Sequence, residues 1–236
     1  MARGYLTFGG VDSRDYGVYI SGTGVYNAPA REYTFTAVPG RSGDLILDGK
    51  RYSNIVITYP AFIYDSFAAN VAGWRNALLT ADGYVRLEDS YLPDEYRLAV
   101  YAGPFDVETA PLRVGGQFDL AFNCKPQRWL KSGEIPITYT ASGTIANPEQ
   151  TEARPLLKIT GTGTCTVGST VITITEANGP TYIDSDLMEI YDSSFNNRGG
   201  YVTMSDNLFP TLAAGENGIQ IGDMTVIEVT PRWWRL

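Results

Sequence analysis

The sequence predicts a mainly β protein made of two domains, with one amphipathic helix in the first. Short segments of alternating apolar and polar residues recur along the chain, separated by turn signals that contain glycine. Short strands with frequent turns favour sandwiches or barrels over a parallel sheet with crossover helices. The composition agrees, because 44% hydrophobic residues in a chain of 236 can form a sizeable core, and 25 glycines and 13 prolines supply turns.

Several segments alternate as a half-buried strand requires. They are residues 34–38, 52–59, 97–101, 117–122, 171–175, 188–191 and 224–229. The turn signals around them are Pro39-Gly40, Asp48-Gly49, Asp82-Gly83, Gly115-Gly116, Asn178-Gly179 and Asn217-Gly218. We therefore expect short strands joined by tight turns.

A single helix is predicted between the second and third of these strands. Its apolar stripe, at spacings of four, three and four, consists of Phe67, Val71, Trp74 and Leu78. Asp65 or Ser66 is expected to cap the start, and Asp82-Gly83 to end the helix. Trp74 is interpreted as a core residue rather than a ligand platform.

The best candidate boundary lies within residues 131–154, where a small, polar stretch with two prolines interrupts the strand pattern. We predict a first domain over residues 1–133 and a second over residues 134–236. The first contains β structure and the helix, and the second β structure alone. The last strand, residues 228–236, either stays in the second domain or packs back on the first.

The composition excludes many functions. The chain contains no histidine, which rules out Ser-His-Asp triads, His-assisted cysteine catalysis and His-containing zinc sites. A net charge of -8 disfavours a dedicated nucleic-acid binder but suits a surface that DNA passes without being held. No cofactor and no metal site is predicted.

The cysteines and the hydropathy of the chain indicate the cellular compartment in which it is made. Cys124 and Cys165 have no metal or redox spacing, and two isolated thiols indicate assembly in a reducing compartment. The start of the chain lacks the apolar stretch of a signal peptide, and no run approaches the length of a membrane span. We expect a protein made in the cytosol, with no membrane partner.

Two groups of carboxylates have a catalytic or metal-binding interpretation beside a structural one. Glu88, Asp89 and Asp94 would suit a glycoside hydrolase, but neighbours in a loop seldom face each other across a cleft. A group able to offer oxygens to calcium is Asp184, Asp186 and Asp192. It lacks the glycine and terminal glutamate of an EF-hand loop. A solvated loop and a strand-flanking turn are favoured, and the chain is predicted not to be an enzyme.

Two further motifs are weaker. Residues 43–50 resemble a phosphate-binding loop but have one residue too many between the glycines, so a hairpin turn at Asp48-Gly49 explains them better. Trp129, Trp233 and Trp234, with the many tyrosines, could stack on sugar rings. Aromatic residues at strand positions more often belong to a core or a subunit interface.

The order of short motifs is more specific than any one of them. In the first half they are residues 8–13, 15–18, 38–44, the helix around Trp74, 83–84, 87–89, 96–99, 122–126 and 128–133. In the second half they are residues 147–148, 153–156, 209–212, 215–217 and 231–234. This collinear series resembles the distal tail protein family of long-tailed, non-contractile phages that infect Gram-positive hosts.

The resemblance implies an architectural role at the distal end of the tail in the virion. Members form a homo-hexameric ring that joins the tail tube protein to the tail-tip hub, contacts the tape measure protein and receptor-binding proteins, and lets genomic DNA pass. The amino-terminal domain builds the ring with a protruding hairpin, and the carboxy-terminal domain is a galectin-like β-sandwich. Catalytic residues are not expected.

The ring interface is assigned to a hairpin within residues 38–59. Its interface residues are predicted to be Pro39, Gly40, Arg41, Gly43, Leu45, Ile46 and Leu47. An apolar tip at Leu45-Ile46-Leu47 suits burial on a partner, although a purely local turn also explains the glycines. The alternative function is a cell-wall carbohydrate-binding module that grips host glycan through the second domain, with contact residues unknown.

Overall fold

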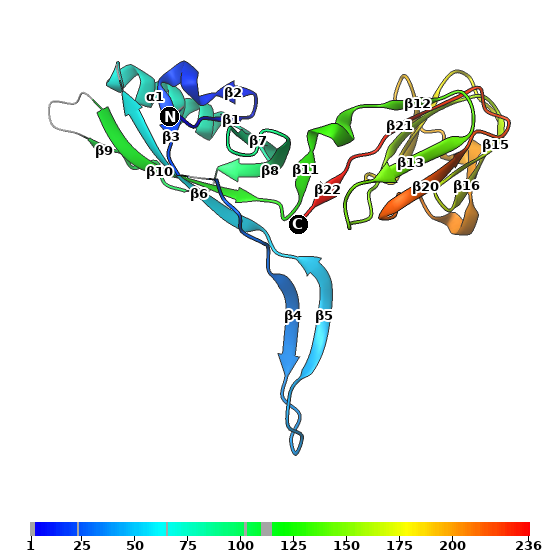
Figure 1. Cartoon of the computed structure of the whole chain (residues 1–236), viewed down its shortest axis with the longest axis horizontal. Coiled ribbons are helices and arrows are strands. Elements are labelled where there is room, and N and C mark those ends of the chain that lie inside the picture. Colours follow the sequence, from blue (N-terminus) through cyan, green and yellow to red (C-terminus); the bar gives the residue numbers. More distant parts are fainter. Residues whose placement is uncertain (1–2, 23, 65, 102, 110–114) are drawn as a thin grey trace. The chain divides into compact units, whose positions relative to one another are not determined.

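The computed structural model describes residues 3–22, 24–64, 66–101, 103–109 and 115–236 (Figure 1). Its contacts divide the chain into two compact units, residues 1–128 with Leu236 and residues 129–235. Both are built of β-strands, and α1 (Phe67–Thr80) is the one α-helix in the described ranges, so the mainly β fold class is confirmed. That the chain folds as two independent domains divided after residue 133 stays a prediction.

The first unit is a curled antiparallel sheet with α1 packed on one face. The sheet order is β2-β1-β7-β8-β10-β6-β3, with β9 beside β10. The bounds are β1 Leu6–Phe8, β2 Val11–Asp12, the 3-10 helix η1 Ser13–Tyr16, β3 Val18–Ile20, β4 Arg31–Thr36, β5 Leu45–Tyr52, β6 Ile55–Tyr64, β7 Val85–Asp89, β8 Glu95–Tyr101, β9 Glu108–Thr109 and β10 Gly115–Cys124.

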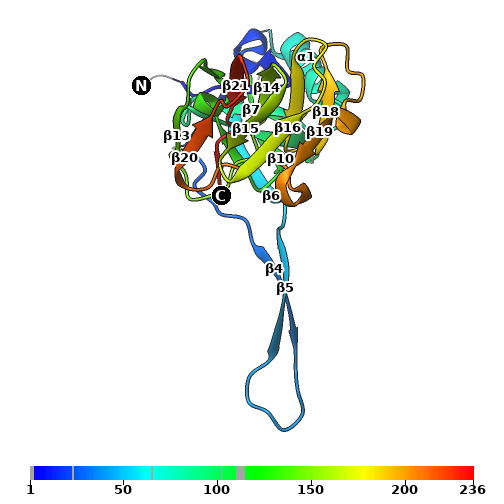
Figure 2. The same cartoon turned by 90° about the vertical axis from the view of Figure 1, so that its right-hand side faces the viewer.

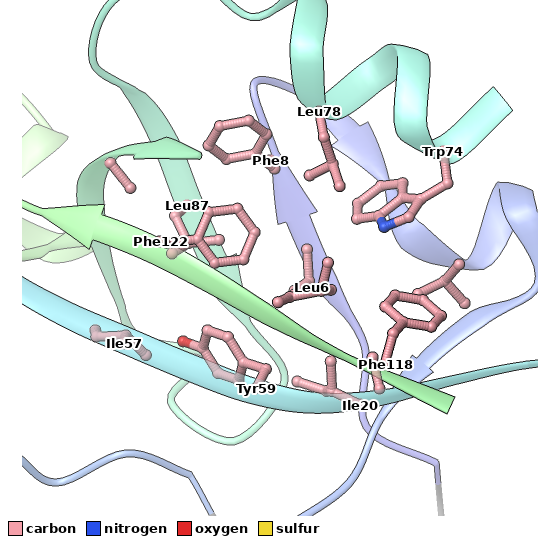
Figure 3. Packing of buried hydrophobic residues seen from close by; sticks show 14 of the residues in the cluster. Leu6, Phe8, Ile20, Ile57, Tyr59, Trp74, Leu78, Leu87, Phe118 and Phe122 are labelled. Atoms are coloured by element: carbon pink, nitrogen blue, oxygen red, sulfur yellow. The ribbon is translucent and has the colours of Figure 1, made fainter. Parts of the chain in front are cut away.

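The core of this unit lies between the sheet and α1 (Figure 3). β6 and β10 pair over ten residues each, and alternate residues such as Tyr59 and Phe122 face inward. Trp74 and Leu78 of α1 point down onto Leu6 and the strands around it. Trp74 is fully buried, which confirms its predicted role as a core residue.

The start of the helix differs from the prediction in one detail. Ser66 precedes α1 in the left-handed region, at φ 39°, and its side chain makes no capping hydrogen bond. The other candidate cap, Asp65, lies outside the described residues. The helix ends at Thr80, and Ala81 follows in an extended conformation, just before the predicted Asp82-Gly83 stop.

The second unit is a sandwich of two antiparallel five-stranded sheets. Their orders are β12-β21-β14-β17-β18 and β13-β20-β15-β16-β19. The bounds of the sandwich strands and the short helices are η3 Lys131–Glu134, β12 Ile137–Tyr139, β13 Gly143–Asn147, β14 Leu156–Thr160, β15 Gly163–Val167, β16 Thr170–Ile174, β17 Thr181–Asp184, β18 Glu189–Asp192, η4 Gly199–Tyr201, β19 Val202–Met204, η5 Ser205–Asn207, β20 Gly215–Gln220 and β21 Val226–Thr230. Two further strands, β11 Arg128–Leu130 and β22 Trp234–Arg235, pair with each other and belong to neither sheet of the sandwich.

Inward-facing residues of both sheets form one apolar core, including Leu157 and Ile227 from the first sheet and Ile172 and Ile219 from the second. The end of the chain forms two strands, β21 and β22, rather than the single strand predicted over residues 228–236. Its packing against the first domain stays a prediction. Among the described residues, no helix combines the length and the apolar character that a bilayer span requires.

Candidate oligomer interface

The most unusual feature of the first unit is the hairpin of β4 and β5. These two strands form a two-stranded sheet of their own, with Phe35 opposite Ile46 and Thr34 opposite Leu47. The hairpin stands clear of the larger sheet (Figures 1 and 2). All residues of β4, and all of β5 except Tyr52 at its end, are exposed.

The turn of the hairpin lies in residues 37–44, where the Pro39-Gly40 signal predicted one. The Arg41 amide donates to the Val38 carbonyl at 3.1 Å, with Pro39 and Gly40 as the central residues. Gly40 has φ 76°, so the sequence meets the demands of a type II turn, which favours proline followed by a residue with positive φ. A Cβ on Gly40 would meet nothing within 4 Å, so the need for glycine is conformational.

The turn predicted at Asp48-Gly49 is wrong, because both residues lie inside β5. Between the pairs Arg31–Tyr52 and Tyr33–Asp48 the register shifts, so the segment forms a β-bulge. The Asp48 carboxylate accepts the Lys50 amide at 2.9 Å, and Lys50 adopts φ 53°. Asp48 and Gly49 therefore lie in an irregular part of the strand, next to a residue with positive φ, and not at the end of the hairpin.

Charged pairs across the strands hold the bulged end of the hairpin. Arg31 donates to Asp48, and Arg51 donates to Glu32. The hydrogen bonds from Arg31 lower the pKa of the Asp48 carboxyl below its usual value, and Asp48 in turn raises the pKa of Arg31. Both pairs join β4 to β5, so they favour the observed register at the bulged end.

The end of the hairpin next to the turn is apolar on both of its faces. Leu45, Ile46 and Leu47 are 47%, 57% and 55% exposed, respectively. Phe35, opposite Ile46, is 60% exposed, and its ring lies 6.2 Å from that of Tyr33 between centroids. Because opposite residues share a face, Phe35 and Ile46 lie on one side, and Leu45 and Leu47 on the other.

Some of this surface was not predicted. Tyr33 and Phe35 belong to the exposed apolar end, although the sequence placed only residues 39–47 there. Phe35 lies in an alternating Thr-Phe-Thr segment, which indicates a strand but not that its apolar side stays in solvent. Arg41, in the turn, forms no ion pair with any described residue and leaves its guanidinium available to a partner.

The carboxylates considered for hydrolysis serve local structure. Asp89 accepts the Tyr59 hydroxyl at 2.8 Å and the amides of Tyr91 and Leu92 at 2.9 and 3.0 Å. Glu88 pairs with Arg86. The predicted solvated loop is wrong for Glu88 and Asp89, because both are half-buried at the end of β7, and only Asp94 lies in the exposed turn that follows.

The carboxylates considered for calcium are also engaged elsewhere. Asp184, 3% exposed, binds the Arg232 guanidinium through two hydrogen bonds of 2.7 and 2.8 Å. Desolvation raises its pKa, but the bonds from Arg232 and the Leu187 and Asp186 amides outweigh this and keep the pKa below the usual value. Within the described ranges, no three acidic or thiol side chains are grouped as metal ligands.

Of the tryptophans considered for sugar stacking, one lies in the core of the second unit and two lie on the paired strands β11 and β22. Trp233 is 5% exposed and lies in that core. The ring of Trp234 lies 6.4 Å from that of Trp129 between centroids, tilted by 47°, and its indole nitrogen donates to the Glu152 carbonyl at 3.0 Å. Trp233 matches the core interpretation, whereas Trp129 and Trp234 are half-buried outside the apolar core and their role stays a prediction.

The arrangement of the two units, a curled sheet with a helix and a long hairpin followed by a sandwich, defines the fold seen in phage baseplate proteins. The structure of the SPP1 Dit protein (gp 19.1), a paradigm of the hub adsorption apparatus in phages that infect Gram-positive hosts, matches with a TM-score of 0.74 and 13% identity, covering 100% of both chains. A chain of the phage P2 baseplate, in its activated conformation with Ca, matches with a TM-score of 0.50 and 10% identity over 97% of this chain and 98% of that chain.

The resemblance to the distal tail proteins is therefore confirmed at the level of the fold. No protein-family model matches the chain, and no curated protein matches it either. The predicted interface residues, Pro39 to Leu47, are brought together on one hairpin by the structure. Their role as an interface stays a prediction.

Proposed function

We propose that this protein is a structural component of a phage tail tip, a baseplate hub protein that assembles into a homo-hexameric ring. The ring joins the tail tube to the tail-tip hub and the host-adsorption apparatus at the distal end of the virion tail. The role is architectural and non-catalytic. The likeness in fold to the SPP1 Dit protein supports the class, and the number six follows from the family resemblance.

The exposed apolar end of the β4–β5 hairpin is the main structural feature that supports this assembly. A two-stranded hairpin is at best marginally stable alone, and one that leaves Phe35, Ile46 and Leu47 more than half exposed gains little from its own packing. Contiguous exposed apolar surface of this kind is typical of interaction sites. Because both faces of the hairpin are apolar, we infer that a partner encloses it.

A neighbouring copy of the chain is the partner that a ring requires. A ring requires a different surface of the neighbour to receive the hairpin, which makes the contact heterologous, and such contacts close into rings when the rotation between subunits closes. Arg41 at the turn adds a guanidinium that can bind a carboxylate or carbonyl of the neighbour.

The net charge of -8 is compatible with a ring through which DNA passes, because a net negative protein repels the phosphate backbone. The further partners proposed are the tail tube protein, the tail-tip hub protein, the tape measure protein and receptor-binding proteins. They follow from the family resemblance.

The test is the mass and shape of the purified chain. Light scattering over a wide concentration range is expected to give about six subunits or two stacked rings, and negative-stain images should show rings with a central opening. A variant with residues 33–47 replaced by Asn-Gly, which keeps the Arg31–Asp48 pair, should remain smaller. A chain that stays monomeric both alone and with tail tube protein would contradict the proposal.

A further inference from the structure

The second unit contains a groove that the ring assembly proposed above does not use. It lies between β18 and β19, the edge strands of the two facing sheets, which Figure 2 shows next to each other. Its volume is about 420 Å³, within the range of small-molecule sites. Its lining includes Tyr191 and Phe195 on one side and Met204 on the other, with Met188, Glu189 and Asn197 around them.

Three aromatic rings form a continuous stack that ends in this groove. Tyr182 and Tyr191 pair across β17 and β18, with ring centroids 5.4 Å apart and planes within 3° of parallel. Phe195 stacks on Tyr191 at 5.3 Å and 22°. Phe195 is 81% exposed, so the stack presents the last ring to solvent. The exposed Phe195 ring therefore offers a flat apolar surface to a ligand.

The loop that holds Phe195 is unusually well fixed for an exposed segment. The Asp192 carboxylate accepts the amides of Ser194 and Asn196 at 2.8 and 3.0 Å and also binds the Asn196 side chain. The Phe195 amide donates to the Asp192 carbonyl at 2.9 Å. These bonds order the loop before a ligand arrives, which lowers the entropy cost of binding.

The backbone at both ends of β18 is strained. Phe195 has φ 61° and Met188 has φ 57°, a region that bulky residues rarely adopt. Strain of this kind is retained where surrounding bonds enforce it, and it concentrates at ligand sites. Here it directs two large apolar side chains to the groove instead of the core.

Polar groups lie beside the aromatic surface. The Glu189 carboxylate accepts no hydrogen bond from any described residue, and the Asn197 side-chain nitrogen donates none. The Asn197 side-chain oxygen Oδ1 accepts the Gly199 amide at 2.8 Å, which sets the direction of the side-chain nitrogen. One acceptor and one donor therefore flank the ring stack.

We propose that this groove binds a pyranose unit of a polysaccharide. The apolar face of the sugar stacks on Phe195, Glu189 accepts from its hydroxyl groups, and the Asn197 side chain donates to them. A flat aromatic ring with a few oriented polar groups matches the two surfaces of a sugar, one apolar and one lined with hydroxyls. The site lies within the second unit and does not depend on ring assembly.

The size of the groove favours a saccharide over a folded protein partner. A stable protein interface buries about 800 Å² on each side, whereas the groove volume of about 420 Å³ lies in the range of small-molecule sites. Affinity for one sugar unit is expected to be weak, in the millimolar range. Several copies presented together would strengthen attachment to a repetitive glycan through multivalency.

The experiment is methionine methyl NMR on the full chain, with tetrasaccharides of glucose, galactose and N-acetylglucosamine as probes. Met188 and Met204 line the groove, and Met224, 5% exposed in the core of the same unit, is an internal control. At least one tetrasaccharide is expected to shift the Met188 and Met204 signals saturably and to leave Met224 unchanged. The linear polyol sorbitol, which has no ring to stack, should have no effect.

Two variants test whether the sugar binds at Phe195 and its loop. Phe195→Asn removes the ring but keeps a residue that tolerates positive φ, and it should weaken binding at least about tenfold. Asp192→Ala keeps the ring and loosens its loop, with a smaller loss. The matched control is Leu208→Asn, 64% exposed and outside the groove lining, which should bind normally.

Three outcomes would overturn the proposal. One is the absence of any saturable shift with all three saccharides at millimolar concentration. The second is unchanged binding by a folded Phe195→Asn variant. The third is a Met188 signal that shifts with protein concentration without sugar, since the groove would then be a contact between copies of the chain.

Discussion

Replacing the apolar end of the hairpin should dissociate the assembly without unfolding the subunit. The variant is Leu45→Thr, Ile46→Thr and Leu47→Thr together, because threonine keeps a high strand propensity while losing most of the apolar surface. The three side chains are 47%, 57% and 55% exposed, so about half of each remains to be buried by a partner.

The magnitude follows from that exposure. Full burial of a leucine or isoleucine is worth about 1.5–3 kcal/mol, so the remaining half contributes about 1 kcal/mol for each residue. The triple variant should lose about 3 kcal/mol for each hairpin docked, which corresponds to about a 150-fold weaker contact. In a ring every subunit contributes one such hairpin, so assembly should shift to much higher protein concentration.

Sedimentation velocity over a concentration series measures this directly. Val171→Thr, a substitution at another exposed strand residue in the second unit, is the matched control and should assemble like the unmodified chain. The free energy of unfolding of the triple variant should change by less than about 0.5 kcal/mol, as for surface substitutions. If the triple variant assembles as well as the control, a partner does not bury the apolar end of the hairpin.

The remaining predictions concern the stability of each unit. Trp74→Ala should destabilise the first unit by about 3–5 kcal/mol, measured by urea unfolding, whereas a loss below about 1 kcal/mol would contradict its place in the core. Asp184→Asn should cost the second unit about 1.5–3 kcal/mol at neutral pH, because Arg232 loses its charged hydrogen-bond partner while its guanidinium stays partly solvated. The folded-state pKa of Asp184 is lowered, so its contribution is present above the ordinary value of 3.8 and is lost as the pH falls through the lowered value. The unmodified protein and the Asp184→Asn variant should therefore reach the same unfolding free energy only below pH 3.8. Equal values near neutral pH would contradict a stabilising Asp184–Arg232 pair. Burial raises the pKa of Cys124 and of Cys165 to about 12, so neither thiol should react with a thiol reagent at about pH 8 until urea unfolds the chain. Rapid labelling of the folded chain would contradict the buried positions of both thiols.

Glycine-containing signals show where local sequence is ambiguous. Gly115-Gly116 and Asn217-Gly218, like Asp48-Gly49, were expected to be turns but lie inside β10, β20 and β5. A Cβ on Gly116 would lie 2.9 Å from the Phe67 ring, so this glycine permits close packing of α1 on the sheet. The same residue type serves a turn, a bulge or a close contact, and only the neighbouring element decides among them.

Features that depend on nearest neighbours along the chain could be predicted before the structure was known. The alternation of residues 117–122 specifies which side of β10 faces the core, and the stripe of Trp74 and Leu78 specifies α1. The Pro39-Gly40 pair specifies the turn between β4 and β5. The strand face, the helix and the turn each follow from local backbone geometry or from a repeating apolar pattern. A short stretch of sequence contains all the residues that define them.

Which apolar residues stay in solvent depends on contacts between segments that are distant in the sequence. Phe35 and Phe122 both lie in alternating strands, yet Phe35 is 60% exposed and Phe122 is fully buried. The difference arises because β10 is covered by α1 and β4 pairs with β5 alone. The stack ending at Phe195 likewise joins residues from two strands and a loop, and its exposure follows from an Asp192 hydrogen-bond network that no periodic pattern predicts.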